Sequence, residues 1–197
     1  MRYMKKLIVI SFLLASLVSF SQNKSNVIKP VFRVIASGGI VVGQKNISSV
    51  FQVIPGVSVK RFYAGAGVGL DDYRFRSIPL FADLRYHFGR REFGFIYVDA
   101  GYSFPFDISK TQDAFKTTDI YKGGFYGDFG LGFRFMSFGK HSFLFSAGYS
   151  IKNIKNMVGH TYTWTLPAET PETFDNYSFS MQRISAKLSW QFSSTKK

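Results

Sequence analysis

Residues 78–88 have the sequence Ile-Pro-Leu-Phe-Ala-Asp-Leu-Arg-Tyr-His-Phe. From Leu80 to Phe88 every second residue is apolar, and the charged residues Asp83 and Arg85 stand between them. This period of two is typical of a β-strand, because successive side chains of a strand point to opposite faces. The stretch therefore predicts a strand with one apolar face and one face that carries charge.

The same alternation recurs along most of the chain. Eight stretches show it, and none has a charged residue on its apolar face: residues 31–43, 50–60, 62–70, 78–88, 93–104, 124–136, 143–152 and 178–192. The links between these stretches alternate between longer and shorter ones: residues 44–49, 60–61, 71–77, 89–92, 105–123, 137–140 and 153–177. An even number of antiparallel strands, with short turns at one end and long loops at the other, predicts an up-and-down transmembrane β-barrel of the outer-membrane type.

The long links are expected to be loops displayed outside the cell. Within one of them, residues 107–122 carry alternating Lys and Asp, which favours a solvated loop or a single turn over a binding helix. The loops 105–123 and 153–177 offer the room in which a function could vary.

The N-terminal segment is predicted to be a cleavable signal peptide. Basic residues near Arg2 precede the apolar segment 7–18, and Ser21 supplies a small residue at the cleavage site. The predicted organisation is a signal peptide at 1–21, a periplasmic lead at 22–30, the outer-membrane barrel at 31–192 and a periplasmic tail at 193–197.

The composition excludes several classes of protein. The 197 residues contain no Cys, which rules out a disulfide framework, a Cys-based metal site and a thiol nucleophile. The 25 Lys and Arg residues outnumber the 12 acidic ones but form no cluster, so we expect no nucleic-acid partner. We also expect no cofactor and no metal site.

The narrow interior of an eight-stranded barrel decides which face points inward. The apolar set is too bulky to fill that interior, whereas the other face is rich in small and polar residues. We therefore expect the apolar face to contact lipid; a soluble barrel with an apolar core would need the opposite polarity. Aromatic residues near the strand ends are predicted to lie at the two membrane interfaces: Phe62, Phe88, Tyr102, Phe104, Phe135, Tyr149, Trp190 and Phe192.

Charged residues on the inward face are predicted to form a salt-bridged polar plug, because charges in a narrow lumen are costly unless they are paired. The set consists of Arg33, Asp83, Arg85, Asp99, Asp128, Arg134, Arg183 and Lys187. A narrow pore that prefers anions is the alternative, since basic residues exceed acidic ones in this set.

Several sequence motifs resemble those of the small eight-stranded outer-membrane barrels of the OmpA-transmembrane and OmpX kind. They are residues 65–73, 78–88, 99–103 and 146–150. The nearest resemblance is to the outer membrane protein beta-barrel domain family that is common in Bacteroidota. It implies an outer-membrane location with periplasmic termini, contact with outer-membrane lipids and lipopolysaccharide, and delivery by the outer-membrane insertion machinery. We expect a monomer with a structural, surface-recognition or adhesion role and no enzymatic activity.

One enzymatic alternative remains, because some eight-stranded outer-membrane barrels are lipid A acyl hydrolases or transferases that use a histidine near the outer rim. His160 lies in a predicted long loop, with Thr161, Glu169 and Ser178 nearby in sequence, so a base, a carboxylate and a hydroxyl could meet there. His87 and His141 lie beside the short turns, at the opposite end of the barrel.

Overall fold

The computed structural model describes residues 29–44, 46–73, 75–106, 117–160 and 173–195. The predicted signal peptide and most of the lead that follows it lie outside the described residues. Within the described ranges, no helix combines the length and the apolar character that a membrane crossing requires.

The described chain is almost entirely β-structure. The elements are β1 (Val31–Val42), β2 (Ile47–Val59), β3 (Phe62–Asp71), β4 (Ser77–Phe88), the short 3-10 turn η1 (Arg90–Glu92), β5 (Gly94–Pro105), β6 (Thr117–Lys122), β7 (Gly124–Phe138), β8 (His141–His160) and β9 (Thr173–Ser193). The first five strands have 10 to 13 residues, close to the ~9–11 that cross a bilayer when tilted.

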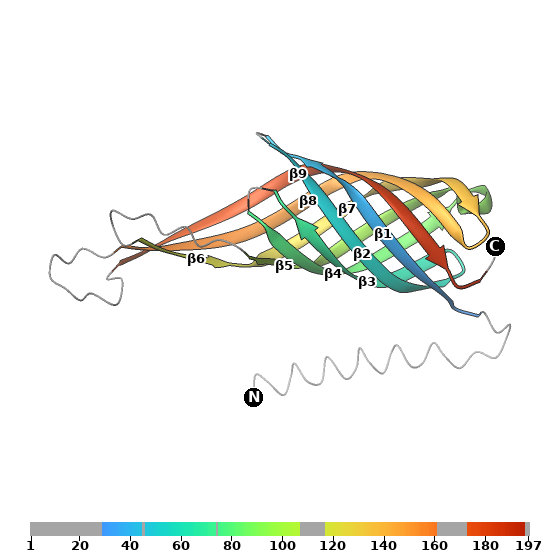
Figure 1. Ribbon diagram of the computed structural model, residues 1–197, viewed down its shortest axis with the longest axis horizontal. Helices are drawn as coiled ribbons and strands as arrows, with labels where there is room; N and C mark the ends of the chain where they lie inside the picture. The colour runs from blue at the N-terminus through green and yellow to red at the C-terminus, as the bar shows by residue number, and fades with distance from the viewer. Residues whose placement is uncertain (1–28, 45, 74, 107–116, 161–172, 196–197) are drawn as a thin grey trace, which may run out of the picture.

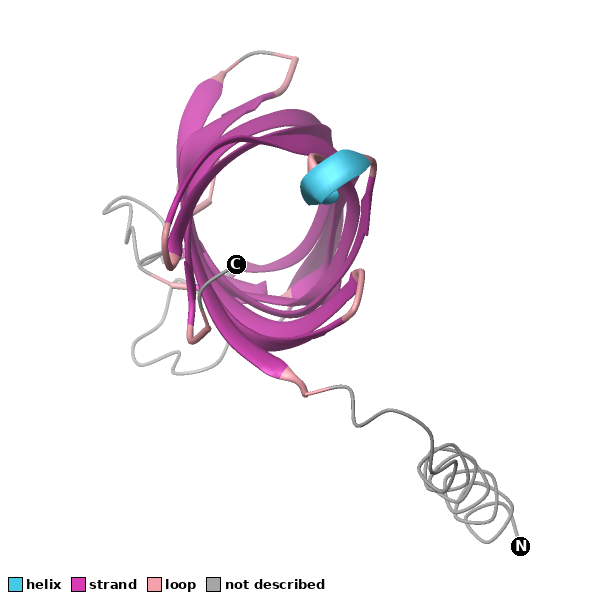
Figure 2. Ribbon diagram, turned by 90° about the vertical axis from the view of Figure 1, so that its right-hand side faces the viewer, coloured by secondary structure: helices cyan, strands magenta, loops and turns pink. Residues whose placement is uncertain are grey.

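The sheet closes on itself. Each strand from β1 to β5 pairs antiparallel with its neighbour in sequence, β5 pairs with β7, and β7 pairs with β8. β9 then pairs with both β8 and β1, which completes a ring of eight strands (Figure 2). The predicted fold, an eight-stranded antiparallel barrel, is confirmed.

β8 and β9 are much longer than the stretches 143–152 and 178–192 that the sequence pattern predicts for them. β8 and β9 stay paired from His141 and Phe192 as far as His160 and Thr173. β6 pairs with the far part of β8 and continues the line of β7 beyond Gly123. These three strands form an arm that projects from one end of the barrel, as Figure 1 shows.

The arm corrects two predictions about loops. Residues 153–160 and 173–177 were expected within a loop and are strand, because each pairs with the other across the β8–β9 hairpin. Residues 117–122 were expected within a solvated loop or turn and also form a strand, since β8 supplies a long-range partner. The remainder of both predicted loops lies outside the described residues.

The two faces of the barrel have the predicted polarity. The side chains of Leu131 and Leu188 on the outer face have exposed fractions of 62% and 55%. Asp128 and Arg183 on the inner face are only 2% exposed. This arrangement contradicts the soluble alternative, in which the apolar face would be the core.

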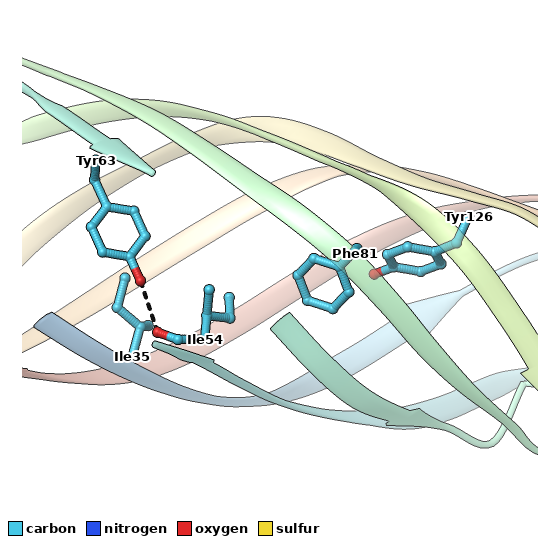
Figure 3. Packing of buried hydrophobic residues seen from close by; sticks show 5 residues of the cluster. All are labelled: Ile35, Ile54, Tyr63, Phe81 and Tyr126. Atoms are coloured by element: carbon cyan, nitrogen blue, oxygen red, sulfur yellow. Dashed lines mark hydrogen bonds between the residues drawn. The ribbon is translucent and has the colours of Figure 1, made fainter. Parts of the chain in front are cut away.

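The interior also contains an apolar cluster that the sequence analysis did not identify. Its members are Ile35, Ile54, Tyr63, Phe81 and Tyr126 (Figure 3). The hydroxyl of Tyr63 donates a hydrogen bond to the carbonyl oxygen of Ile54 at 2.7 Å, so its polar end is satisfied. Gly67 leaves room for the ring of Phe81, because a Cβ at that position would lie 2.4 Å from the ring.

Candidate functional site

The lumen is filled by three layers of interacting side chains. The middle layer centres on Lys187 of β9, whose Nζ lies 3.2 Å from Oδ2 of Asp128 and 3.6 Å from Oδ2 of Asp99. The same ammonium donates to Oε1 of Gln52 at 3.2 Å. Because β9, β7, β5 and β2 all contribute, this layer ties several walls of the barrel together.

Three aspartates lie side by side in the middle layer. The strand register places Asp99 of β5 directly opposite Asp83 of β4 on one side and Asp128 of β7 on the other. Arg85 binds Asp83, with Nη2 and Nε lying 2.8 and 2.9 Å from Oδ2. Neither carboxylate oxygen of Asp99 accepts a hydrogen bond from the described residues, and its ion pair with Lys187 is the longer of the two.

Aromatic rings surround these charges. The guanidinium of Arg85 lies over the rings of Phe95 and Tyr97, 5.4 and 5.8 Å from their centroids, in cation–π geometry. The hydroxyl of Tyr97 donates to Oδ1 of Asp128 at 2.9 Å. Gly148 admits this hydroxyl, because a Cβ on Gly148 would lie 2.2 Å from it.

A second layer closes the end of the lumen from which the arm projects. Asp71, at the end of β3, receives Arg183 Nη1 at 2.6 Å and Lys152 Nζ at 3.3 Å, both on Oδ2. Lys152 also donates to the carbonyl oxygens of Tyr73 and Phe75, at 3.3 and 2.8 Å. The link between β3 and β4 is thereby held inward, over the lumen.

An apolar cap accompanies this second layer. Tyr73 is buried in a cluster with Val41, Val50, Ile154 and Met181, against which Phe75, Tyr121 and Phe179 pack. The ring of Phe75 lies 5.3 Å from that of Tyr121 and 5.6 Å from that of Phe179, between centroids. The link was expected to be displayed outward; its aromatic residues instead connect the barrel to the base of the arm.

A third layer closes the opposite end, where the short turns lie. Oε2 of Glu92, in η1, accepts a hydrogen bond from Arg134 Nη2 at 3.5 Å and forms an ion pair with Arg33 Nη2 at 3.7 Å. Arg134 also donates to the carbonyl oxygen of Arg91 at 3.3 Å. The η1 turn lies at the rim of the barrel (Figure 2). Since Arg33 belongs to β1 and Arg134 to β7, the ion pairs of Glu92 link two distant walls there.

The structure buries all eight residues of the predicted plug but distributes them differently from the sequence interpretation. Asp83, Arg85, Asp99, Asp128 and Lys187 share the middle layer. Arg183 joins the arm-end layer, whereas Arg33 and Arg134 join the turn-end layer.

The sequence interpretation missed three residues of the arm-end and turn-end layers: Asp71, Lys152 and Glu92. The alternation could have identified Lys152, because it lies an even number of residues after Ser146 and Ser150 and therefore on the same inward face of the strand. Asp71 and Glu92 lie in expected links, where parity gives no signal.

The aromatic residues predicted for the membrane interfaces lie on the outer face. Six have exposed side chains and two are half-buried. The exposed ones are Phe62, Phe88, Tyr102, Phe104, Phe135 and Trp190, and the half-buried ones are Tyr149 and Phe192. Some of them make ring contacts with a neighbouring strand, such as Phe62 with Tyr86 at 5.0 Å between centroids.

The histidines do not form a catalytic group among the described side chains. The backbone of His160 pairs with Thr117 and Thr173 at the tip of the arm, and its side chain lies outside the described set. His87 is buried near the turn end, and His141 stacks on Trp190 with an interplanar angle of 12°. In the described part of the chain, no group of three or more His, Cys, Asp or Glu residues is arranged to hold a metal ion.

No protein-family model matches the sequence, and no curated protein matches it significantly. Among solved structures, the chain is similar to the solid-state NMR structure of outer membrane protein AlkL in DMPC lipid bilayers. The TM-score is 0.43 at 14% identity, and the similarity covers 88% of this chain and 94% of that chain. At this level of similarity, no property of AlkL transfers to this chain.

Proposed function

We propose that the protein spans a bacterial outer membrane as a barrel with a closed lumen, and that it anchors the β6–β8–β9 arm and the adjoining loops at the cell surface for a structural or recognition role. The finer assignment, to the outer membrane protein beta-barrel domain family of Bacteroidota, belongs to the same proposal and rests on the sequence motifs.

The polarity of the barrel wall carries the proposal. Large apolar side chains cover the outer face on every strand of the ring, for example Phe51, Leu84 and Ile184, and they are exposed. Monomeric soluble proteins rarely expose apolar patches beyond a few hundred Å². A surface of this kind around the whole barrel is stable in contact with hydrocarbon, where closure also satisfies the backbone hydrogen bonds.

The three layers support a lumen that does not conduct. Each layer contains ion pairs that join different parts of the barrel wall, in the turn-end layer through Glu92 of η1, and the arm end is also closed by an apolar cap. An ion that entered would have to displace paired charges in a space that side chains already fill.

The near balance of basic and acidic residues inside the barrel argues against a pore that selects anions. The interior contains six basic residues and five acidic ones among the described residues: Arg33, Arg85, Arg134, Lys152, Arg183 and Lys187, against Asp71, Asp83, Glu92, Asp99 and Asp128. The excess of positive charge is smaller than the sequence analysis predicts, because Asp71 and Glu92 were not counted there.

Planar-bilayer recording of the purified protein tests the proposal. Insertion is verified first, by membrane fractionation and by heat-modifiable migration of the folded barrel on a gel. We expect no stable channel steps from inserted protein, and stable anion-selective steps would refute the closed lumen. Mass spectrometry of lipid A tests the enzymatic alternative: a mass shift that disappears in His160→Ala would overturn the non-enzymatic role.

A further inference from the structure

A surface pocket lies at the turn end of the barrel, outside the three layers of the lumen. It has a volume of about 570 Å³ and is lined by Phe88, Gly89, Arg90, Arg91, Phe93 and Gly94. A pocket of this size falls within the ~300–1,000 Å³ that small-molecule sites occupy. The closed lumen makes no use of it.

The η1 turn separates charges of opposite sign. Glu92 forms ion pairs with Arg33 and Arg134 in the lumen, whereas Arg90 and Arg91 are exposed and line the pocket. The backbone adopts left-handed φ values of 56° at both Arg91 and Glu92, which costs free energy for residues with a Cβ. This strained turn leaves two exposed arginines at the pocket, and none of the described residues that line it is acidic.

The remaining walls of the pocket are aromatic and belong to the outer face. The ring of Phe93 stacks on that of Phe133 of β7, with 5.8 Å between centroids and 19° between planes. The ring of Phe88 lies over Gly94, where a Cβ would come within 2.5 Å of it. The pocket therefore borders the apolar wall of the barrel on one side and the two arginines on the other.

We propose that this pocket is a fixed binding site for the headgroup of an anionic phospholipid in the adjacent leaflet, a proposal that rests on the bilayer-spanning role. Two guanidinium groups match the charge and the oxygen geometry of a phosphodiester, which they bind in bidentate fashion. The rings of Phe88 and Phe93 lie where the glycerol backbone and the first methylenes of the acyl chains would follow. Aromatic side chains favour this zone of a bilayer.

Native mass spectrometry of the protein released from neutral detergent micelles provides the test. The probes are dioleoylphosphatidylglycerol and dioleoylphosphatidylcholine, which have the same acyl chains and the same phosphodiester. The choline ammonium of the second lipid cancels the charge of its phosphodiester and would place a positive charge beside the two arginines. We expect wild-type protein to retain dioleoylphosphatidylglycerol in preference to dioleoylphosphatidylcholine. The double variant Arg90→Gln/Arg91→Gln should lose about tenfold in apparent affinity for phosphatidylglycerol, because it removes both charge-assisted guanidinium contacts to the headgroup.

The chain offers a matched control. Lys60→Gln/Arg61→Gln removes two positive charges from another short turn at the same end, outside the pocket, and should keep the preference. Phe93→Ser retains both arginines and removes one aromatic wall, so it should also weaken retention. An equal loss in both double variants would show diffuse charge attraction and refute the site, as would equal retention of the two lipids by wild-type protein.

Failure of this inference is distinguishable from failure of the proposed function. Wild-type protein that inserts into vesicles but shows no lipid preference refutes only the headgroup site. Protein that folds and does not insert refutes the bilayer-spanning role.

Discussion

Asp71 on β3 and Arg183 on β9 meet across the lumen, with 2.6 Å between Oδ2 and Nη1. The same carboxylate binds Lys152, so one anion holds two buried cations. We expect Asp71→Asn to lower the free energy of unfolding by about 3–5 kcal/mol, because it leaves buried positive charge uncompensated. Urea titration of the folded protein in micelles, followed by circular dichroism, measures this loss.

The neighbouring residue supplies the control for that experiment. Asp72 binds Arg76 at 2.8 Å, but the two side chains are 54% and 58% exposed. Asp72→Asn should therefore change the free energy of unfolding by less than about 1 kcal/mol. Equal losses in the two variants would contradict the assignment of Asp71 to a buried layer.

The two aspartates that share Lys187 should respond differently to amide substitution. Asp128 accepts hydrogen bonds from Tyr97 and Lys187, and Asp128→Asn should lower the free energy of unfolding by about 2–3 kcal/mol. Asp99 stands between two like charges and accepts no hydrogen bond from the described residues. Asp99→Asn should therefore be neutral or stabilising, by up to about 1 kcal/mol. The same urea titration ranks the two variants, and a greater loss for Asp99→Asn would be inconsistent with this geometry.

Much of the barrel follows from alternation alone, because in a strand the side of each residue is fixed by its parity. Asp83 and Arg85 share a parity and share the inner face, and Leu84 between them lies on the outer face. The closure of the ring follows from the even number of strands and from the backbone N–H and C=O groups that an open sheet would leave unpaired at its edges.

The partners of the buried charges could not be predicted in this way. Parity places Arg183 inside, but the choice of Asp71 over Asp128 depends on how far each strand is staggered around the ring, which only the closed register determines. Tyr73 follows two aspartates in an expected link, so its sequence context indicates a solvated loop. Tyr73 is buried instead, because Lys152 on the opposite wall donates a hydrogen bond to its carbonyl oxygen.

Gly148 is expected to tolerate no side chain. A Cβ there would lie 2.2 Å from the hydroxyl oxygen of Tyr97 and 2.5 Å from the carbonyl oxygen of Phe129. Gly148→Ala should therefore lower the free energy of unfolding by about 1–3 kcal/mol, since both neighbours would have to move. Gly38→Ala is the matched control, because its Cβ would meet only the ring of Phe51, at 3.4 Å. Thermal unfolding of the two variants in the same micelles gives the comparison, and a stable Gly148→Ala would show that Tyr97 does not cross the lumen at this point.

The link between β3 and β4 should become accessible to protease when the hydrogen bonds from Lys152 are removed. Lys152 holds the carbonyl oxygens of Tyr73 and Phe75 inward, and Lys152→Met keeps the length of the side chain but removes these hydrogen bonds. Asp71 retains Arg183 as its counter-ion, so the barrel should remain folded. We expect trypsin to cleave after Arg76 about tenfold faster in this variant, because loss of ~1.4 kcal/mol of local stability raises the open population tenfold. Lys155 is an exposed residue on the same strand, so trypsin should cleave the Lys155→Met variant after Arg76 at the wild-type rate. Mass spectrometry of the fragments identifies the site, and unchanged cleavage in Lys152→Met would mean that the apolar cap alone holds the link over the lumen.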